Sequence, residues 1–123
     1  MGMKESGEMY LETILVLGKA QDEVHAIDIA NSLKFSKASV SKALARLKAD
    51  KFIVVDERGL IALTEAGRSL AEKIYKRHQL LCKALTSIGV KEDTALEDAC
   101  RIEHYISDET YKAIKNYMKG KNG

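Results

Sequence analysis

Three side chains near the C-terminal end of the chain could together bind a transition metal. Cys100, Glu103 and His104 stand at positions i, i+3 and i+4, so on a helix they share one face. Their thiolate, carboxylate and imidazole groups are three good donors for such a metal. The same triplet also fits a structural role, with a buried cysteine, a surface glutamate and a histidine at a helix end. The spacing alone leaves both interpretations open.

Three further side chains could complete such a site from other parts of the chain. His78 stands at the edge of the apolar stripe of a long predicted helix, and Met9 and Glu12 are three residues apart on the first predicted helix. A thioether and a second carboxylate could then approach from the N-terminal part. Taken alone, Met9 is more typical of core packing, because methionine fills irregular gaps.

Length and composition are those of a globular protein with one or two small helical units. Hydrophobic residues make up 46% and charged residues 31% of the 123 residues, which argues against disorder. The sequence has no run long and apolar enough for a membrane span, and its start lacks the apolar stretch of a secretory signal. We therefore expect a cytoplasmic protein. Cys82 and Cys100 do not resemble a disulfide framework, and we expect free thiols with a structural or metal-binding role.

The distribution of charge is more informative than the net charge of +2. Between positions 34 and 51 a single acid, Asp50, is accompanied by six basic residues, which are Lys34, Lys37, Lys42, Arg46, Lys48 and Lys51. Between positions 92 and 109 seven acids accompany Arg101. A basic patch beside a helix suits a phosphate backbone, although a solvated helix face has the same pattern.

The N-terminal half follows the element order of a winged helix-turn-helix. Apolar residues at helical spacing predict three helices, over about residues 8–20, 27–33 and 37–50. Ser36 is suited to cap the third helix. Two apolar stretches, 52–55 and 60–63, flank a turn that ends in Gly59 and predict a β-hairpin.

The third predicted helix has a small and basic outer face. Val40, Leu44 and Leu47 form its buried stripe, which leaves five residues outward: Ala38, Ser41, Lys42, Ala45 and Arg46. Such a face suits entry into a major groove about 12 Å wide. The element order, the short turn and this face together favour DNA binding. The alternative is a three-helix core whose hairpin has no role in binding.

The C-terminal half is predicted to be helical. A long helix capped by Thr64 is expected over about residues 65–87, followed by helices over 92–105 and 108–118 and a frayed tail from Lys119. The length of the first of these helices suggests a connector between a DNA reader and a metal sensor.

The sequence resembles the diphtheria-toxin-repressor family of metal-dependent regulators, which includes iron-dependent and manganese-dependent repressors. The similarity extends from Glu8 to about Lys115. The stretches that carry it are residues 8–14, 29–30 through 39–41, 63–68, 76–78, 97–104 and 107–109.

The resemblance implies a mostly α-helical protein in two parts. Residues 1–64 would form a winged helix-turn-helix with a β-hairpin wing, and residues 65–123 a helical dimerisation and metal-binding domain. It also implies a homodimer that binds a palindromic double-stranded DNA operator and represses genes of metal homeostasis. The chain would be the short form of the family, without the extra C-terminal barrel of longer members.

The resemblance also implies the metal ligands Met9, Glu12, His78, Cys100, Glu103 and His104. Met9 and Cys100 are similar to the iron-dependent branch, whereas Glu12 together with His78 is similar to the manganese-dependent branch. Because the thiolate and the thioether are soft donors, we expect Fe(II) first and Mn(II) second. Cys82 and Leu96 depart from the residues that build an ancillary site in the iron branch, which weakens that site here.

The predicted DNA contacts are Ser36, Lys37, Ala38, Ser39, Ser41, Lys42, Arg46 and, in the wing, Arg58. A second hypothesis keeps this fold but replaces the metal by thiol oxidation at Cys100 or Cys82, or by an organic ligand. An enzyme that uses Glu103 and His104 on a metal is disfavoured, because nothing in the sequence suggests the open cleft that a catalytic metal needs.

Overall fold

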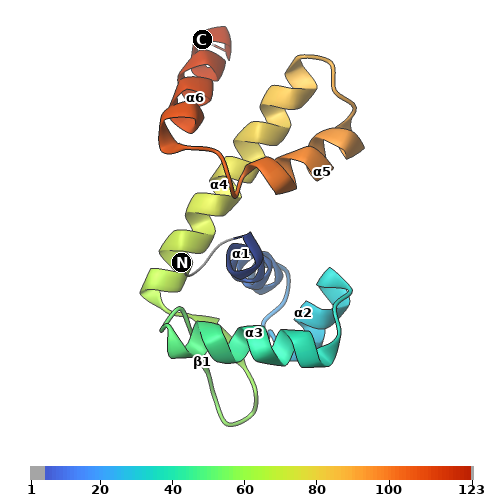
Figure 1. The fold of residues 1–123 in the computed structure, drawn as a ribbon, viewed down its shortest axis with the longest axis vertical. Coiled ribbons are helices and arrows are strands. Elements are labelled where there is room, and N and C mark those ends of the chain that lie inside the picture. The colour runs from blue at the N-terminus through green and yellow to red at the C-terminus, as the bar shows by residue number, and fades with distance from the viewer. Residues whose placement is uncertain (1–4, 123) are drawn as a thin grey trace. The chain divides into compact units, whose positions relative to one another are not determined.

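The computed structural model describes residues 5–122, and the side chains of residues 7–120. The elements are α1 (Glu5–Ala20), α2 (Ala26–Leu33), α3 (Lys37–Ala49), β1 (Ile53–Val55), β2 (Ile61–Leu63), α4 (Glu65–Ser87), α5 (Glu92–Ile102) and α6 (Asp108–Asn122) (Figure 1). The predicted fold class, mostly helical with one hairpin, is confirmed. None of the described helices combines the length and apolar character that a membrane span requires.

The chain divides into two compact units, residues 1–72 and 73–123, with the boundary inside α4. In the first unit α1 packs against α2, α3 and β2. Leu11, Ile29, Val40 and Ile53 are the large side chains at the centre of its core, each at most 1% exposed. The stripe predicted for α3 is confirmed, since Val40, Leu44 and Leu47 are all buried.

The hairpin after α3 is a two-stranded antiparallel sheet in which Ile53 pairs with Leu63 and Val55 with Ile61. Its turn is organised by Asp56, whose carboxylate accepts the backbone N–H groups of Leu60 and Arg58, each at 2.9 Å. The bond from Leu60 is the main cause that lowers the pKa of Asp56 below its ordinary value. The wing therefore has a turn fixed by its own aspartate.

The start of α4 is held against the two residues that precede β1, Lys51 and Phe52. The Thr64 hydroxyl accepts the Gly67 N–H at 3.1 Å and donates to the Lys51 carbonyl at 2.8 Å, which confirms Thr64 as a cap. A Cβ atom on Gly67 would lie only 1.9 Å from the Phe52 carbonyl oxygen. This approach of two backbones therefore requires a glycine.

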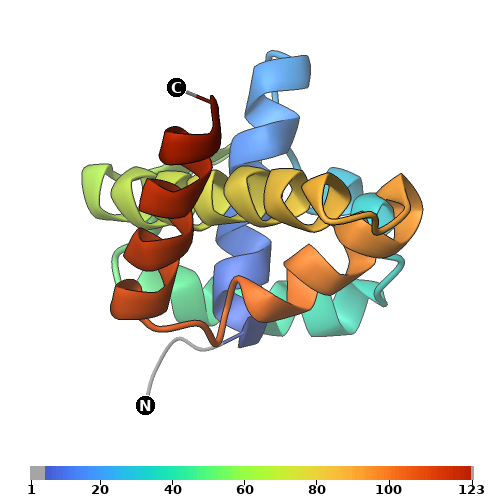
Figure 2. The ribbon, with the colours of Figure 1, turned by 90° about the horizontal axis from the view of Figure 1, so that it is seen from above.

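In the second unit α5 and α6 both pack against α4 (Figure 2), around Ile74, Leu81, Ala95 and Ala99, which are buried. Arg77 of α4 is also buried, at 6% exposure. Its Nη1 donates to the Ile106 carbonyl at 2.8 Å, and its Nη2 pairs with the Asp108 carboxylate. One cation thus fixes the link between α5 and α6 to α4.

Three predicted helix ends are wrong. The fifth helix ends at Ile102 instead of Tyr105, because the N–H groups of Tyr105 and Ile106 both bond to the Ile102 carbonyl and the chain turns there. The first helix begins at Glu5, three residues before the predicted start. The predicted frayed tail is instead part of α6, which continues to Asn122 beyond the buried Met118; Gly123 lies outside the described residues.

Candidate metal centre and DNA-binding face

Three of the predicted metal ligands come together in the second unit. One donor atom each from His78, Cys100 and Glu103 lies within 4.8 Å of the others. The His78 Nδ1 atom lies 2.7 Å from Glu103 Oε1 and 3.8 Å from Cys100 Sγ. Cys100 stands on the last turn of α5, and Glu103 keeps α-helical backbone angles as its C-cap. The face shared by positions i and i+3 therefore survives the early end of the helix.

The carboxylate of Glu103 is the most constrained group of this cluster. Glu103 is 0% exposed, and its Oε2 atom forms no hydrogen bond with any described residue. The His104 imidazole lies beside this oxygen, with its Nε2 atom 3.4 Å from Oε2. A buried carboxylate without compensation is costly, and a divalent cation would supply it. The donor atoms gathered here are one sulfur, imidazole nitrogens and the carboxylate oxygens. Such a mixed set of donors suits a divalent transition metal.

A second sulfur lies beside the same imidazole. Cys82 is one helical turn beyond His78 on α4, and its Sγ atom lies 3.6 Å from His78 Nε2. Cys100 Sγ approaches the other ring nitrogen. Neither cysteine forms a disulfide in the part of the chain that the structure describes. His78 is thus flanked by one thiol on each ring nitrogen.

Arg77 is a supporting residue that the sequence interpretation missed. Its guanidinium lies 5.3 Å from the centre of the Tyr111 ring, in addition to its bonds to Ile106 and Asp108. Arg77 precedes His78 and holds the segment that follows His104. Its place on the buried face of α4, three residues after Ile74 and four before Leu81, is the pattern that could have revealed it.

The other two predicted ligands, Met9 and Glu12, lie on α1 in the first unit, where both are half-buried. The approach of Met9 and Glu12 to the metal-binding residues of the second unit stays a prediction. Leu96, at the position expected to weaken an ancillary site, is 51% exposed.

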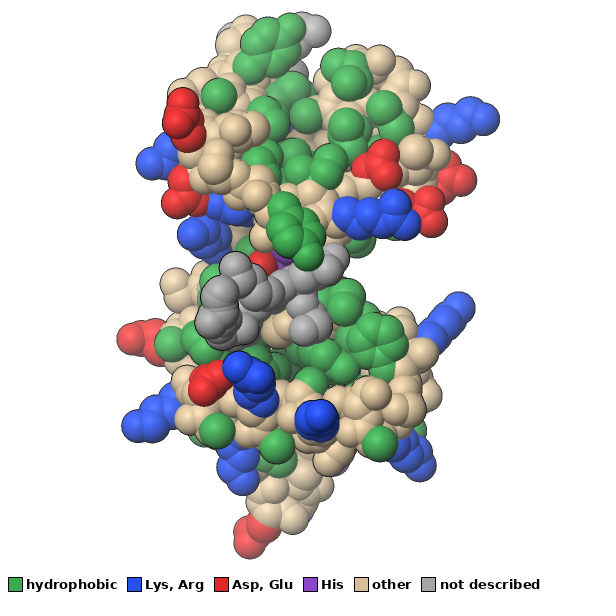
Figure 3. All heavy atoms as spheres, viewed as in Figure 1, with side chains coloured by type: hydrophobic (Ala, Val, Ile, Leu, Met, Phe, Trp, Pro, Cys, Tyr) green, Lys and Arg blue, Asp and Glu red, His purple; other side chains and the backbone are tan. Residues whose placement is uncertain are grey.

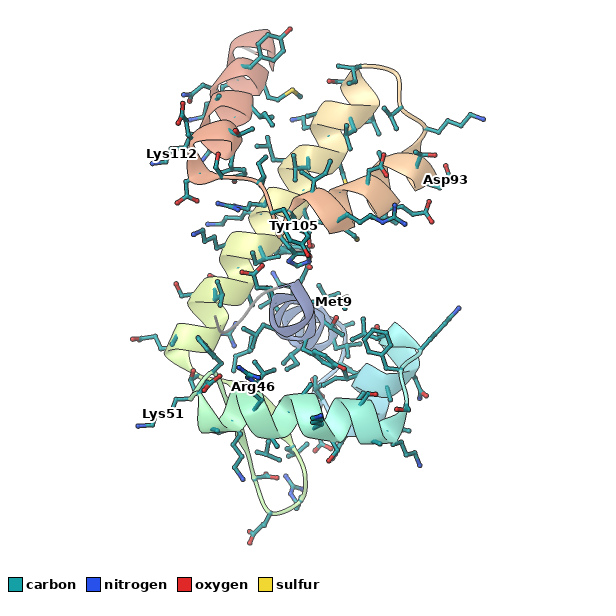
Figure 4. The ribbon with its side chains drawn as sticks, viewed as in Figure 1. Met9, Arg46, Lys51, Asp93, Tyr105 and Lys112 are labelled. Carbon is teal, nitrogen blue, oxygen red and sulfur yellow. The ribbon has the colours of Figure 1, made fainter. Side chains whose placement is uncertain are left out.

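The predicted DNA contacts form an exposed face on the first unit. Ser36 caps α3 by accepting the Ser39 N–H at 3.1 Å, and all eight predicted contact residues are exposed. Lys42 and Arg46 line a groove of about 570 Å³ together with the two serines. Arg46 lies on α3 in Figure 4, and Figure 3 shows Lys and Arg side chains over this unit. Such a cationic face with a capped helix N-terminus suits a phosphate backbone.

Arg58 in the wing has an acidic neighbour in its own turn. Its Nε atom lies 4.0 Å from the Asp56 carboxylate, and its side chain is 69% exposed. An exposed pair of this kind contributes little to stability, so the guanidinium can exchange its partner for a phosphate.

Comparison with known proteins finds two family models that match successive parts of the chain. Residues 3–60 match the N-terminal DNA binding domain of the iron dependent repressors, and residues 64–120 match their metal binding and dimerisation domain. The HTH-type transcriptional regulator MntR of Geobacillus kaustophilus is 36% identical over 103 residues, which is 83% of this chain and 72% of that protein.

Two further proteins extend the similarity over almost the whole chain. The diphtheria toxin repressor of Corynebacterium diphtheriae is 33% identical over 116 residues, which is 94% of this chain and 51% of that protein. A solved manganese-dependent transcriptional repressor in complex with manganese has a TM-score of 0.85 at 25% identity and covers 92% of this chain. The chain spans about half the length of these two longer proteins.

Proposed function

Because the chain belongs to the iron-dependent repressor family, we propose that it represses transcription by binding operator DNA when a divalent transition metal is bound beside Glu103. The observation that carries this proposal is the buried Glu103 carboxylate, with one oxygen on His78 and the other without a hydrogen bond among the described residues. The family consists of DNA-binding regulators, so we propose a regulator rather than an enzyme. Its place of action would be the cytoplasm.

We assign His78, Cys100, Glu103 and His104 as the ligands from the second unit, and Met9 and Glu12 as those from the first. The metal would supply positive charge to Glu103 and link groups that are distant in sequence. Since the proposed ligands belong to both units, a metal that binds one arrangement of them better than others shifts the population toward it. The functional domains would be residues 1–64 and 65–123, divided just before α4 begins.

The metal preference follows from the softness of the donors. Cys100 offers a thiolate and Met9 a thioether, which favour Fe(II) over Mn(II), whereas the carboxylates and imidazoles suit both metals. The similarity to a manganese-dependent repressor and to the diphtheria toxin repressor supports this class of metal. We therefore propose Fe(II) as the first activating metal and Mn(II) as the second.

The second unit offers a face for a homodimer. A groove of about 960 Å³ is lined by α4, the end of α5 with the segment that follows it, and α6, and most of its lining residues are apolar. Ile88, Tyr105 and Tyr117 line this groove and are 73%, 71% and 63% exposed. Figure 3 shows hydrophobic side chains gathered on this unit. Burial of such a patch against a second copy is strongly favourable, and a two-fold dimer would present two α3 helices to a palindromic operator.

The test is a selection of duplexes from a random-sequence pool, under anaerobic conditions, with Fe(II), with Mn(II) and with a chelator. The proposal predicts one enriched palindromic sequence with either metal and none with the chelator. Enrichment of the same sequence in the chelator would contradict the metal requirement, and enrichment of nothing under any condition would contradict specific DNA binding.

A second candidate rests on the two thiols that flank His78. In that case DNA binding would respond to the oxidation of Cys82 or Cys100 and not to metal. The same selection separates the two, because the thiol-switched regulator enriches its operator in the chelator and loses it after treatment with peroxide.

A further inference from the structure

Two lysines hold a backbone conformation that normally belongs to glycine. Lys34 has φ 59° and Lys51 has φ 65°, and no other non-glycine residue with a positive φ occurs among the described residues. Lys34 is the C-cap of α2, and Lys51 comes two residues after the end of α3. In this left-handed region the Cβ atom crowds the backbone, so each lysine carries a conformational penalty that glycine would not.

The backbone itself does not need a lysine at either position. After Lys34 the Phe35 N–H bonds to the Ala30 carbonyl at 3.1 Å, and after Lys51 the Phe52 N–H bonds to the Leu47 carbonyl at 3.0 Å. These bonds close the two helix ends, and a glycine would make them equally well.

The side chains of Lys34 and Lys51 form no polar contact among the described residues that would offset this conformational penalty. Both lysines are exposed, and neither ammonium group has a hydrogen-bond or ion-pair partner in the part of the chain that is described. The remaining structural benefit is the attraction between a cation and the C-terminal end of a helix, which is weak at an exposed site.

The two positions bracket the helix that is proposed to enter the major groove. The 13 residues of α3 span about 20 Å at 1.5 Å per residue, whereas the groove is about 12 Å wide. Residues just beyond both ends of α3 therefore come close to the two phosphate strands that border the groove. Lys34 lines the same surface groove as Lys42 and Arg46, and Figure 4 shows Lys51 at the other end of α3.

We propose that Lys34 and Lys51 are phosphate contacts at the two ends of α3, and that their left-handed backbone lowers the stability of the fold in favour of DNA binding. The inference rests on the proposed function, that this protein binds duplex DNA. Both lysines belong to the basic stretch between positions 34 and 51, but neither is among the eight contact residues predicted from the sequence.

The test uses the full chain with Mn(II) and measures both thermal unfolding and DNA affinity for Lys34→Gly, Lys51→Gly and the double variant. The probe is the duplex selected from the random pool. Each single variant should unfold a few degrees higher than the parent, since glycine relieves the strain. Each should also bind more weakly, and the slope of log affinity against log salt should fall by about 1.8 for each single variant, because the dimer carries two copies of the lysine. The ratio of variant to parent Kd should then shrink about 12-fold for each single variant between 50 and 200 mM salt.

Matched variants separate the two effects. Lys34→Ala should lose DNA affinity without gaining stability, and Lys34→Asn, which tolerates the left-handed region, should behave like glycine. Lys112→Ala, at an exposed position of α6, should change neither quantity. An unchanged salt slope in the double variant would overturn the proposal. Glycine variants that are no more stable than the parent would also overturn it, because the lysines would then act only by stabilising the C-terminal ends of the two helices. If the parent itself binds no duplex, the proposed function fails instead.

Discussion

The Nδ1 atom of His78 lies 2.7 Å from the Oε1 atom of Glu103, and this pair joins α4 to the end of α5. If Glu103 is a metal ligand, Glu103→Gln should weaken metal binding by at least about 100-fold while the amide keeps the bond to His78. The metal-free variant should be more stable than the metal-free parent by about 1–3 kcal/mol, because a buried charge without full compensation is removed.

Calorimetric titration with Co(II) and chemical denaturation check both expectations. Glu97→Gln is the matched control, since Glu97 is exposed on the same helix. A Glu103→Gln variant that binds Co(II) as tightly as the parent does would remove Glu103 from the ligand set.

Cys100 decides the choice between iron and manganese. Replacing it by Glu exchanges a soft thiolate for a hard carboxylate, so Cys100→Glu should shift the order of activating metals toward Mn(II). The Co(II)-loaded parent should show a thiolate charge-transfer band that the variant lacks. Cys82→Ser is the control, because Cys82 approaches the other nitrogen of His78 and is not in the proposed ligand set. Absence of the band in the parent, with an unchanged order of metals, would show that Cys100 is not a ligand.

Lys42 on the outer face of α3 is predicted to contact DNA. If it binds phosphate, Lys42→Ala should weaken binding to all sequences alike and lower the salt slope of the dimer, which carries two copies of Lys42, by about 1.8. If it reads a guanine, the loss should be about 1–3 kcal/mol and confined to one base position. Fluorescence anisotropy at several salt concentrations distinguishes these cases, with Lys115→Ala on α6 as the control. Agreement with the parent at every salt concentration would exclude both roles.

Gly67 fixes the start of α4 against Phe52. A methyl group there would meet the Phe52 carbonyl oxygen at 1.9 Å, so Gly67→Ala should destabilise the fold by about 3 kcal/mol. Gly18 on α1 is the opposite case, because a Cβ atom there meets nothing within 4 Å, and Gly18→Ala should stabilise by up to about 1 kcal/mol. Urea denaturation of both variants measures the difference, and a Gly67→Ala protein as stable as Gly18→Ala would refute the predicted clash.

The elements that the sequence predicted well are those with a local signal. The stripe of Val40, Leu44 and Leu47, with Ser36 before it, defines α3 through periodicity and capping chemistry, both of which act within one helix. The end of α5 had no such signal, since residues 103–105 include neither glycine nor proline. That end coincides with a tertiary contact, the bond between Arg77 and the Ile106 carbonyl 29 residues away.

In the candidate site, too, the features with a local sequence signal could be predicted and those that depend on tertiary packing could not. The spacing of Cys100 and Glu103 was visible in the sequence, but the convergence of His78 on both residues depends on how α4 and α5 pack. The left-handed backbone at Lys34 and Lys51 could not be predicted, because lysine gives no local signal for that conformation.

The most direct test of the central claim is the affinity for the selected duplex, measured anaerobically as Fe(II) or Mn(II) is added and then removed by a chelator. If metal binding and DNA binding are coupled by a free energy of typical size, the Kd for DNA should be about 5- to 150-fold lower with metal. The chelator should reverse this change fully. Glu103→Gln should stay at the metal-free affinity throughout. An operator affinity of the parent that is the same in the chelator as in saturating metal would contradict the claim that this protein is a metal-activated repressor.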